Sequence, residues 1–227
     1  MSRTDAFFDM DGTLIKKNAI QHYLYLGTQN LPLVNRWALV MKIIFLLPFY
    51  FILDSIDRRL FNHFFYHNYS NYSLKYINNE SKNYFDLKIK DSIFSDALDC
   101  IEQHREQGNL LILVTGSLDF IAQPLADFLN FDAVLATKLE NKDEYYTGKI
   151  EGVSIIGEEK AKAMKNLALE LEIDLNKSFG YGDSISDLEM LKIVSNSIVF
   201  NPNNKLQVIA QQKDWQIKNW NETRLYN

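Results

Sequence analysis

An apolar stretch near the start of the chain leads directly into two carboxylates and a glycine, in the order Ala6-Phe7-Phe8-Asp9-Met10-Asp11-Gly12-Thr13. If this stretch is a strand that ends in a tight turn, both acids lie at its carboxyl tip, where ligands bind in open α/β sheets. One carboxylate there can attack an electrophile, its neighbour can move a proton, and both can hold a divalent cation. The pair alone is a weak signal, because 29 acidic residues produce such spacings by chance.

A second segment combines a buried-strand pattern with a hydroxyl and a glycine. Residues 110–114 are continuously apolar and lead into Thr115-Gly116-Ser117. A glycine lets backbone N–H groups approach an oxyanion closely, and Thr115 can donate a further hydrogen bond. The alternative is an ordinary turn from a strand to a helix, with Ser117 as the N-cap.

Two later segments add a lysine and another acidic pair. Lys160 begins a predicted helix that continues to about residue 172, and a solvated lysine is the alternative interpretation. Residues 179–191 then carry a glycine turn with two acids four residues apart. We expect Asp183 at the tip of a strand and Asp187 in the first turn of the next helix, where a carboxylate is favourable.

Helical and strand patterns alternate from residue 91 onward, which favours a parallel doubly wound sheet. Besides the two strands above, the sequence predicts strands and one hairpin arm at residues 133–136, 145–149, 178–181 and 197–200. Residues 14–90 show no strand alternation and are predicted to be helical. We therefore expect an α/β core from residues 1–13 and 91–227, and an inserted α-helical cap from residues 14–90.

Two helices of the expected core have clear end signals. One should start with Ser95 as its N-cap and end at Gly108. The other should lie near residues 121–129, where Pro124 kinks it or delays its start.

Taken together, the acidic and glycine-containing segments resemble the motifs of the haloacid dehalogenase (HAD) superfamily, and in particular subfamily IB, which is similar to phosphoserine phosphatase. The matching residues are Asp9-Met10-Asp11-Gly12-Thr13, then Thr115, then Lys160, then Gly182-Asp183-Ser184 with Asp187. The resemblance implies a Rossmann-like core with a C1-type cap over the strand tips. It also implies a Mg²⁺-dependent phosphatase that hydrolyses phosphomonoesters through an aspartyl-phosphate.

The resemblance implies a catalytic role for each matching side chain. Asp9 is the expected nucleophile. Asp11 is expected to protonate the leaving alcohol and then to activate water. Thr115 is expected to bind phosphoryl oxygens, and Lys160 to offset the negative charge of Asp9 and phosphate.

The resemblance also implies a metal site and a phosphate contact. Mg²⁺ is expected to be held by Asp9, the backbone carbonyl of Asp11, and Asp183, with Asp187 helping to orient the site. The backbone N–H of Gly116 is expected to bind the phosphoryl group beside Thr115.

Substrate recognition departs from the phosphoserine phosphatase pattern at Asn18. In those enzymes a glutamate at the matching position holds the amino group of the substrate, and an uncharged amide does not form that ion pair. Arg58 and Arg59 are candidates to bind a carboxylate or a second phosphate, and a solvated helix face is the alternative.

The expected cap contains an unusually apolar segment, residues 37–53, in which Lys42 is the one charge. Its seventeen residues are at the lower limit for a membrane span. A single crossing would put halves of one sheet on opposite sides of a bilayer, and Lys42 would add about 2.5–3.5 kcal/mol. Three interpretations stay open: a buried hairpin broken at Pro48, an apolar wall for a greasy substrate, or a surface that lies on a membrane.

Composition limits the function further. The net charge is −5, and acidic and basic residues are mixed, so the charge does not indicate binding to nucleic acid. Cys100 is the single cysteine, which suits a reducing compartment, and residues 1–5 show no secretory h-region, so we expect a cytoplasmic protein with peripheral membrane contact left open. The four histidines show no metal-ligand spacing and are expected to carry no chemistry.

Three functions remain after these arguments. The first is a Mg²⁺-dependent phosphatase acting on a phosphomonoester, with an amphiphilic or lipid-derived ester as the candidate substrate. The second is a phosphoserine-type phosphatase of a small metabolite, which Asn18 disfavours. The third is a non-catalytic module that binds a phospholigand or a membrane, which the two acids Asp9 and Asp11 disfavour because binding needs no nucleophile. The sequence does not indicate an oligomeric state.

Overall fold

The computed structural model of the protein describes residues 4–220. The expectation that residues 1–5 are not part of a secretory signal therefore falls mostly outside the described residues. Within residues 4–220, seven strands form one sheet in the order β4-β3-β2-β1-β5-β6-β7. These strands are β1 (Ala6–Phe8), β2 (Leu111–Leu118), β3 (Ala133–Lys142), β4 (Tyr145–Glu151), β5 (Phe179–Gly182), β6 (Asn196–Phe200) and β7 (Gln216–Lys218).

The first motif lies at the centre of this sheet. Strand β1 pairs in parallel with β2, with Phe8 opposite Leu113, and in parallel with β5, with Phe8 opposite Tyr181. The outer pairs are also parallel, except that β3 and β4 form an antiparallel hairpin. The predicted doubly wound parallel sheet is therefore confirmed, including the hairpin arm.

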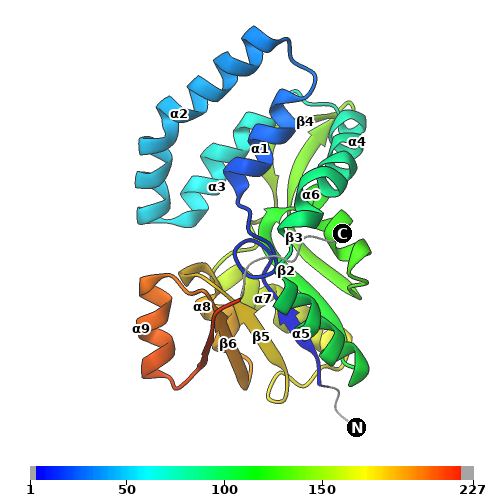
Figure 1. Ribbon diagram of the computed structural model, residues 1–227, viewed down its shortest axis with the longest axis vertical. Coiled ribbons are helices and arrows are strands. Elements are labelled where there is room, and N and C mark those ends of the chain that lie inside the picture. Colours follow the sequence, from blue (N-terminus) through cyan, green and yellow to red (C-terminus); the bar gives the residue numbers. More distant parts are fainter. Residues whose placement is uncertain (1–3, 221–227) are drawn as a thin grey trace.

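Helices and short helical turns connect the strands (Figure 1). The α-helices are α1 (Ala19–Thr28), α2 (Leu33–Ile56), α3 (Arg58–Tyr66), α4 (Leu74–Tyr84), α5 (Ser95–Glu106), α6 (Asp119–Phe128), α7 (Glu158–Glu170), α8 (Leu188–Leu191) and α9 (Asn204–Gln212). The short turns are η1 (His67–Tyr69), η2 (Phe85–Ile89), η3 (Lys90–Ser92) and η4 (Ile185–Asp187).

Two hydrophobic clusters cover the two faces of the sheet, because successive side chains of a strand point to opposite faces. Phe8 of β1 belongs to the larger cluster, which includes Ile101 of α5 and Leu125 of α6. Phe7 belongs to the smaller cluster with Met164 of α7 and Leu206 of α9. This burial fixes the direction of β1, so that residues directly after Phe8 emerge at the carboxyl edge of the sheet.

Residues 14–90, which follow β1, are largely helical, as predicted, and lie above the carboxyl ends of the strands (Figure 1). The interior of this insert is aromatic: Phe65 stacks on Phe61 and packs edge-to-face on Tyr23 and Tyr50. The β3–β4 hairpin reaches into this insert, where Tyr146 exchanges backbone hydrogen bonds with residues 71 and 72. The domain boundaries at residues 13 and 91 stay a prediction.

Two helix starts differ from expectation. Helix α5 has Phe94 at its N-cap position, and Ser95 is already its first helical residue. Helix α6 begins at Asp119, five residues before Pro124. A proline inside a helix removes one backbone hydrogen bond, but burial of Ile121 and Leu125 on either side stabilises the helical path.

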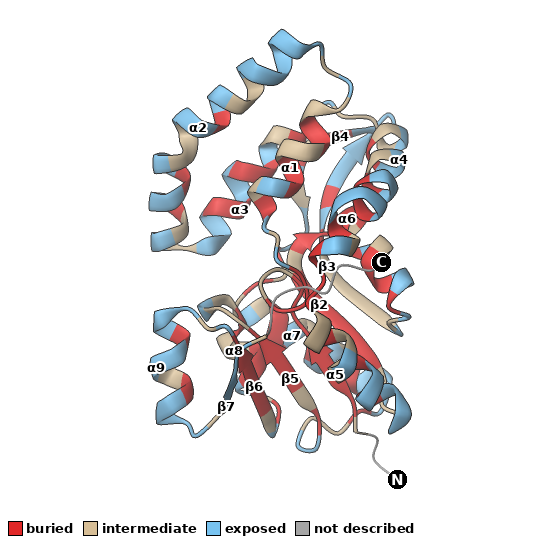
Figure 2. Ribbon diagram, in the orientation of Figure 1, coloured by how far each residue is buried: buried red, intermediate tan, exposed pale blue. Residues whose placement is uncertain are grey.

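The apolar segment forms one continuous helix, so the interpretation of residues 37–53 as a buried hairpin broken at Pro48 is wrong. Helix α2 is 24 residues long in total, and Pro48 lies inside it. By length and by composition, with a mean hydropathy of 2.0, it could cross a membrane. Most of α2 is exposed, with buried residues on one side (Figure 2). Ile43 and Tyr50 on its inner side pack on the insert, whereas Phe45 on its outer side is 84% exposed. Because β1 and β2 are neighbours in one sheet, the chain returns to the same place after α2, which excludes a lone crossing.

Candidate active site

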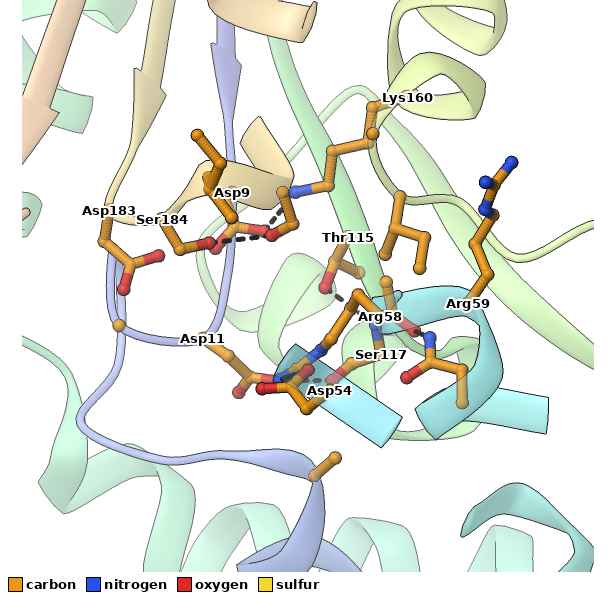
Figure 3. A pocket seen from close by; sticks show the side chains of 18 of the residues that line it. Asp9, Asp11, Asp54, Arg58, Arg59, Thr115, Ser117, Lys160, Asp183 and Ser184 are labelled. Atoms are coloured by element: carbon orange, nitrogen blue, oxygen red, sulfur yellow. Dashed lines mark hydrogen bonds and ion pairs between the residues drawn. The ribbon is translucent and has the colours of Figure 1, made fainter. Parts of the chain in front are cut away.

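The motif residues converge at the carboxyl edge of the sheet, around a pocket of about 650 Å³ (Figure 3). Asp9 follows β1, Thr115 lies in β2, and Asp183 follows β5, so three adjacent strands contribute. Lys160 reaches the same point from the first turn of α7. Residues that are up to 174 positions apart in the chain thus meet because their strands are neighbours in the sheet.

Lys160 joins two of the acids. Its side chain is 1% exposed, and its Nζ donates hydrogen bonds to Asp9 Oδ1 and, over 2.6 Å, to Asp187 Oδ1. Burial opposes the charged lysine, but the carboxylates of Asp187 and Asp9 outweigh it and raise the pKa of Lys160 above its usual range. Lys160 therefore carries a positive charge against Asp9, which rules out the solvated alternative.

One lysine does not balance the acids that surround it. Burial, followed by the carboxylate of Asp187, raises the pKa of Asp9 to about 7, although Lys160 lowers it. Burial, followed by the carboxylates of Asp187 and Asp9, raises the pKa of Asp183 well above its usual range. The site has an excess of negative charge that a cation would relieve.

Asp9, Asp183 and Asp187 have the chemistry and spacing to hold that cation. One carboxylate oxygen from each lies within 4.8 Å of the others, and hard oxygen ligands suit Mg²⁺. Asp187 is fully buried, and its Oδ2 accepts hydrogen bonds from the backbone N–H groups of Asp183 (3.2 Å) and Ser184 (3.0 Å). Asp187 therefore holds both Lys160 and the turn that carries Asp183.

The end of β2 offers hydrogen-bond donors to the pocket. Thr115 is buried and its Oγ1 accepts from the Ser117 N–H over 3.0 Å, so its own hydroxyl proton can go to another acceptor. The carbonyl of Gly116 accepts from the Tyr66 hydroxyl over 2.8 Å. The N-cap position of α6 belongs to Leu118, and Ser117 instead donates from its Oγ to Asp11 Oδ2.

Sequence reasoning missed two partners of Asp11, namely Ser117 and His22. His22 Nε2 lies 2.8 Å from Asp11 Oδ1, so one of the four histidines contacts a motif residue. No residue pattern around His22 signals this contact, which joins helix α1 to the turn after β1.

The predicted substrate residues line the pocket but already have partners. Asn18 is the N-cap of α1, and its Oδ1 accepts from the Gln21 N–H over 3.1 Å. Arg58 donates to Asp54 over 2.8 Å (Figure 3). Arg59 forms an ion pair with Asp57 over 2.6 Å. The guanidinium groups face the pocket rim as ion pairs rather than as single charges.

Comparisons with known proteins agree with this geometry. A family model of haloacid dehalogenase-like hydrolases matches residues 6–192. The Mycobacterium tuberculosis protein named Probable phosphatase Rv3661 is 30% identical over 226 residues, which cover 95% of this chain and 75% of that protein. Phosphoserine phosphatase SerB1 of the same species is 28% identical over 140 residues, and this chain spans 46% of its length.

Solved structures share the fold. A protein with unknown function from Bordetella pertussis Tohama I matches with a TM-score of 0.84 and 24% identity, covering 96% of this chain and 98% of that one. A phospho-aspartyl intermediate analogue of phosphoserine phosphatase matches with a TM-score of 0.70 and 18% identity, covering 98% of this chain and 96% of that one. With a family model that covers most of its length and the motif residues of that family gathered at one sheet edge, the chain belongs to the haloacid dehalogenase-like hydrolases.

Proposed function

We propose that the protein is a Mg²⁺-dependent phosphomonoester hydrolase that acts through an aspartyl-phosphate on Asp9. The observation that carries the proposal is the buried contact between Lys160 and Asp9, beside the carboxylates of Asp183 and Asp187 at the strand tips. Several relatives carry phosphatase names, which supports the same reaction. Binding alone needs neither a nucleophile nor a second acid at its side, so the non-catalytic alternative is disfavoured.

The side chains divide the reaction into two balanced steps. A carboxylate oxygen of Asp9 attacks phosphorus, the bond from phosphorus to the ester oxygen breaks, and Asp11 gives its proton to the leaving alcohol. Asp11 then takes a proton from water, whose oxygen attacks the aspartyl-phosphate and releases inorganic phosphate and free Asp9. Thr115 and the Gly116 N–H donate hydrogen bonds to the phosphoryl oxygens throughout.

The acids and the lysine provide the charge balance for this reaction. Lys160 offsets the charge of Asp9 as the dianionic ester approaches. Mg²⁺, held by Asp9, Asp183 and the Asp11 carbonyl, would supply the remaining positive charge that a phosphate dianion requires. Asp187 keeps Asp183 and Lys160 in place through its two oxygens.

We further propose that the ester is amphiphilic or lipid-derived and that the protein meets it at a membrane surface from the cytoplasmic side. The C-terminal end of α2, with Asp54, Ser55 and Ile56, lines the pocket. From there an exposed apolar stripe follows α2 away from the pocket, formed by Ile56, Ile52, Phe51, Phe49, Phe45, Ile44, Met41, Trp37, Val34 and Leu33. Exposed apolar patches of this kind are rare on soluble monomers and mark interaction sites.

A phosphoserine-type phosphatase is the second candidate. The fold neighbours and SerB1 favour it, while Asn18 offers no carboxylate to an ammonium group. Phosphate release from esters with graded acyl tails and from phosphoserine separates the two candidates. Preference for longer tails supports the amphiphilic substrate, and preference for phosphoserine overturns it. The reaction itself is tested by removing Mg²⁺ with a chelator and by the Asp9→Asn variant. Each change should abolish turnover.

A further inference from the structure

We propose that His22, a residue of the helical insert, is a positioning residue that holds the carboxylate of Asp11 for proton transfer to the leaving group. The proposal rests on the proposed phosphatase reaction and extends it to a residue outside the motifs. Its basis is a chain of contacts from the insert to the acid, through Tyr84, His22 and Asp11.

His22 is fully buried on α1, yet both of its ring nitrogens have polar partners. Its Nε2 lies 2.8 Å from Asp11 Oδ1, and its Nδ1 lies 3.0 Å from the hydroxyl of Tyr84 on α4. The rings of His22 and Tyr84 also meet edge-to-face, with centroids 5.6 Å apart. Two separate helices of the insert thus fix the orientation of the imidazole.

Donor and acceptor chemistry gives this chain one consistent direction. An ionised carboxylate only accepts hydrogen bonds, so the hydrogen between His22 and Asp11 belongs to Nε2. In the neutral ring Nδ1 is then an acceptor, and the Tyr84 hydroxyl is able to donate to it. Tyr84 therefore favours the tautomer in which Nε2–H points at Asp11.

The contact leaves one oxygen of Asp11 for chemistry. Oδ1 is tied to the buried ring of His22, while Oδ2 accepts from Ser117, a residue that lines the pocket. A serine hydroxyl reorients easily, whereas a buried imidazole held at both nitrogens does not. We assign Oδ2 as the oxygen that carries the transferred proton, and His22 as the group that keeps it directed at the pocket.

The location of the partners distinguishes this arrangement from an ordinary buried histidine. His22 and Tyr84 belong to the insert, and Asp11 belongs to the turn after the central strand. The acid is therefore oriented only when the insert is seated on the core. A comparison is available in His104, which is also buried and bonded through Nε2, over 2.7 Å, to Tyr181, but which lines no part of the pocket.

The test compares His22→Leu, His22→Gln and the control His104→Leu on two substrates. An alkyl phosphate needs a proton on its leaving oxygen, whereas 4-nitrophenyl phosphate leaves with little help. We expect His22→Leu to lower kcat for the alkyl ester by about 10- to 100-fold and for the aryl ester much less, since misplacing a catalytic group costs up to about 100-fold. His22→Gln, whose amide N–H can reach the same oxygen, should recover most of the loss, and His104→Leu should leave the alkyl-to-aryl ratio unchanged.

Two further measurements keep the proposal falsifiable if His22→Leu folds poorly. Tyr84→Phe should shift the alkyl-to-aryl ratio in the same direction as His22→Leu. In the metal-free protein, ¹⁵N resonances of the His22 ring should show a hydrogen on Nε2. A bare Nε2, or equal losses on both esters in the variants, overturns the role of His22. A wild type without phosphatase activity overturns the proposed function instead, while the ¹⁵N result still reports on the contact.

Discussion

The carboxylate of Asp183 occupies the space that a side chain at Gly12 would need. A Cβ added to Gly12 would lie 2.3 Å from Asp183 Oδ2, and the φ of Gly12 is +89°, in the left-handed region. The glycine of the first motif is therefore required by an acid of the last motif. Gly12 and Asp183 follow β1 and β5, which are direct neighbours in the sheet, so the two turns lie side by side at its carboxyl edge.

Gly12→Ala should displace Asp183 and lower Mg²⁺-dependent phosphate release by about 100-fold, the usual cost of a misplacement near 1 Å. The matched control is Gly108→Ala, because Gly108 has a φ of +73° but nothing within 4 Å of an added Cβ. The control should lose about 1–2 kcal/mol of stability from backbone strain and keep its activity. Similar kcat values for both variants would contradict the steric role of Gly12.

The metal-free protein should lose stability as the pH rises from about 4 to about 7, the range between the ordinary pKa of Asp9, 3.8, and its raised value. In this range folded Asp9 keeps a proton that the unfolded chain has released, so the folded state is favoured at low pH and loses that advantage as pH rises. Asp183, whose pKa is also raised, acts in the same direction. Mg²⁺ should raise the Tm more at the upper end of the range than at the lower end.

Thermal denaturation with chelator and with Mg²⁺, in the wild type and in Asp9→Asn, measures this effect. The variant lacks the titrating group, so the difference in Tm between the two proteins should change across the same pH range. A difference that does not depend on pH would show that Asp9 titrates at its ordinary value.

Asp11→Asn should separate proton transfer from metal binding. Its proposed contact with Mg²⁺ is through the backbone, so the increase in Tm on adding Mg²⁺ should persist. Phosphate release from an alkyl ester should fall by about 10²- to 10⁴-fold, the range for general acid–base catalysis, and release from 4-nitrophenyl phosphate should fall less. Steady-state rates of phosphate release from both esters test this prediction. An equal loss on both esters would count against Asp11 as the acid.

Phe45 and Ile52 should contribute to affinity for amphiphilic substrates, because they are 84% and 58% exposed on the apolar stripe of α2. In the wild type, kcat/KM should rise with tail length by up to about 0.8 kcal/mol per buried CH₂. The double variant Phe45→Ser and Ile52→Ser should flatten that rise and weaken sedimentation with liposomes, while hydrolysis of a small aryl phosphate stays unchanged.

Leu169→Ser is the control for this experiment, because Leu169 is 81% exposed on α7, outside the insert. It should leave both the dependence on tail length and the binding to liposomes as in the wild type. If the wild type neither prefers longer tails nor sediments with liposomes, the stripe has another partner and a small polar phosphate becomes the better substrate.

The residues of the two proposed catalytic steps were predictable as a group because their signals are local. Asp9 and Asp183 each directly follow an apolar run and lie in a glycine turn, and parallel strands end at a common edge of a sheet. The alternation of helices and strands then determined that these edges coincide. The predicted antiparallel arm at residues 145–149 was likewise found, as part of β4.

Sequence patterns did not predict the contacts between the insert and the core. Nothing in the residues around His22 indicates that its ring meets Asp11, since that contact depends on how α1 seats on the turn after β1. The same holds for Ser117, whose local pattern equally predicts a helix N-cap. Such contacts are set by side-chain directions across two packed elements, and residue spacing within one element carries no information about them.

Helix α2 shows the same division between composition and packing. Its sequence indicates an apolar segment at the lower limit for a membrane span. The same sequence is compatible with a buried hairpin, an apolar wall for the substrate or a surface that lies on a membrane. The tertiary structure excluded the buried hairpin, because Phe45 and Ile52 face away from the insert and α1 and α3 cover only the opposite side. The apolar composition of α2 indicates that its surface is unfavourable in water. Only the packing of the neighbouring helices determines which side of α2 the chain itself covers.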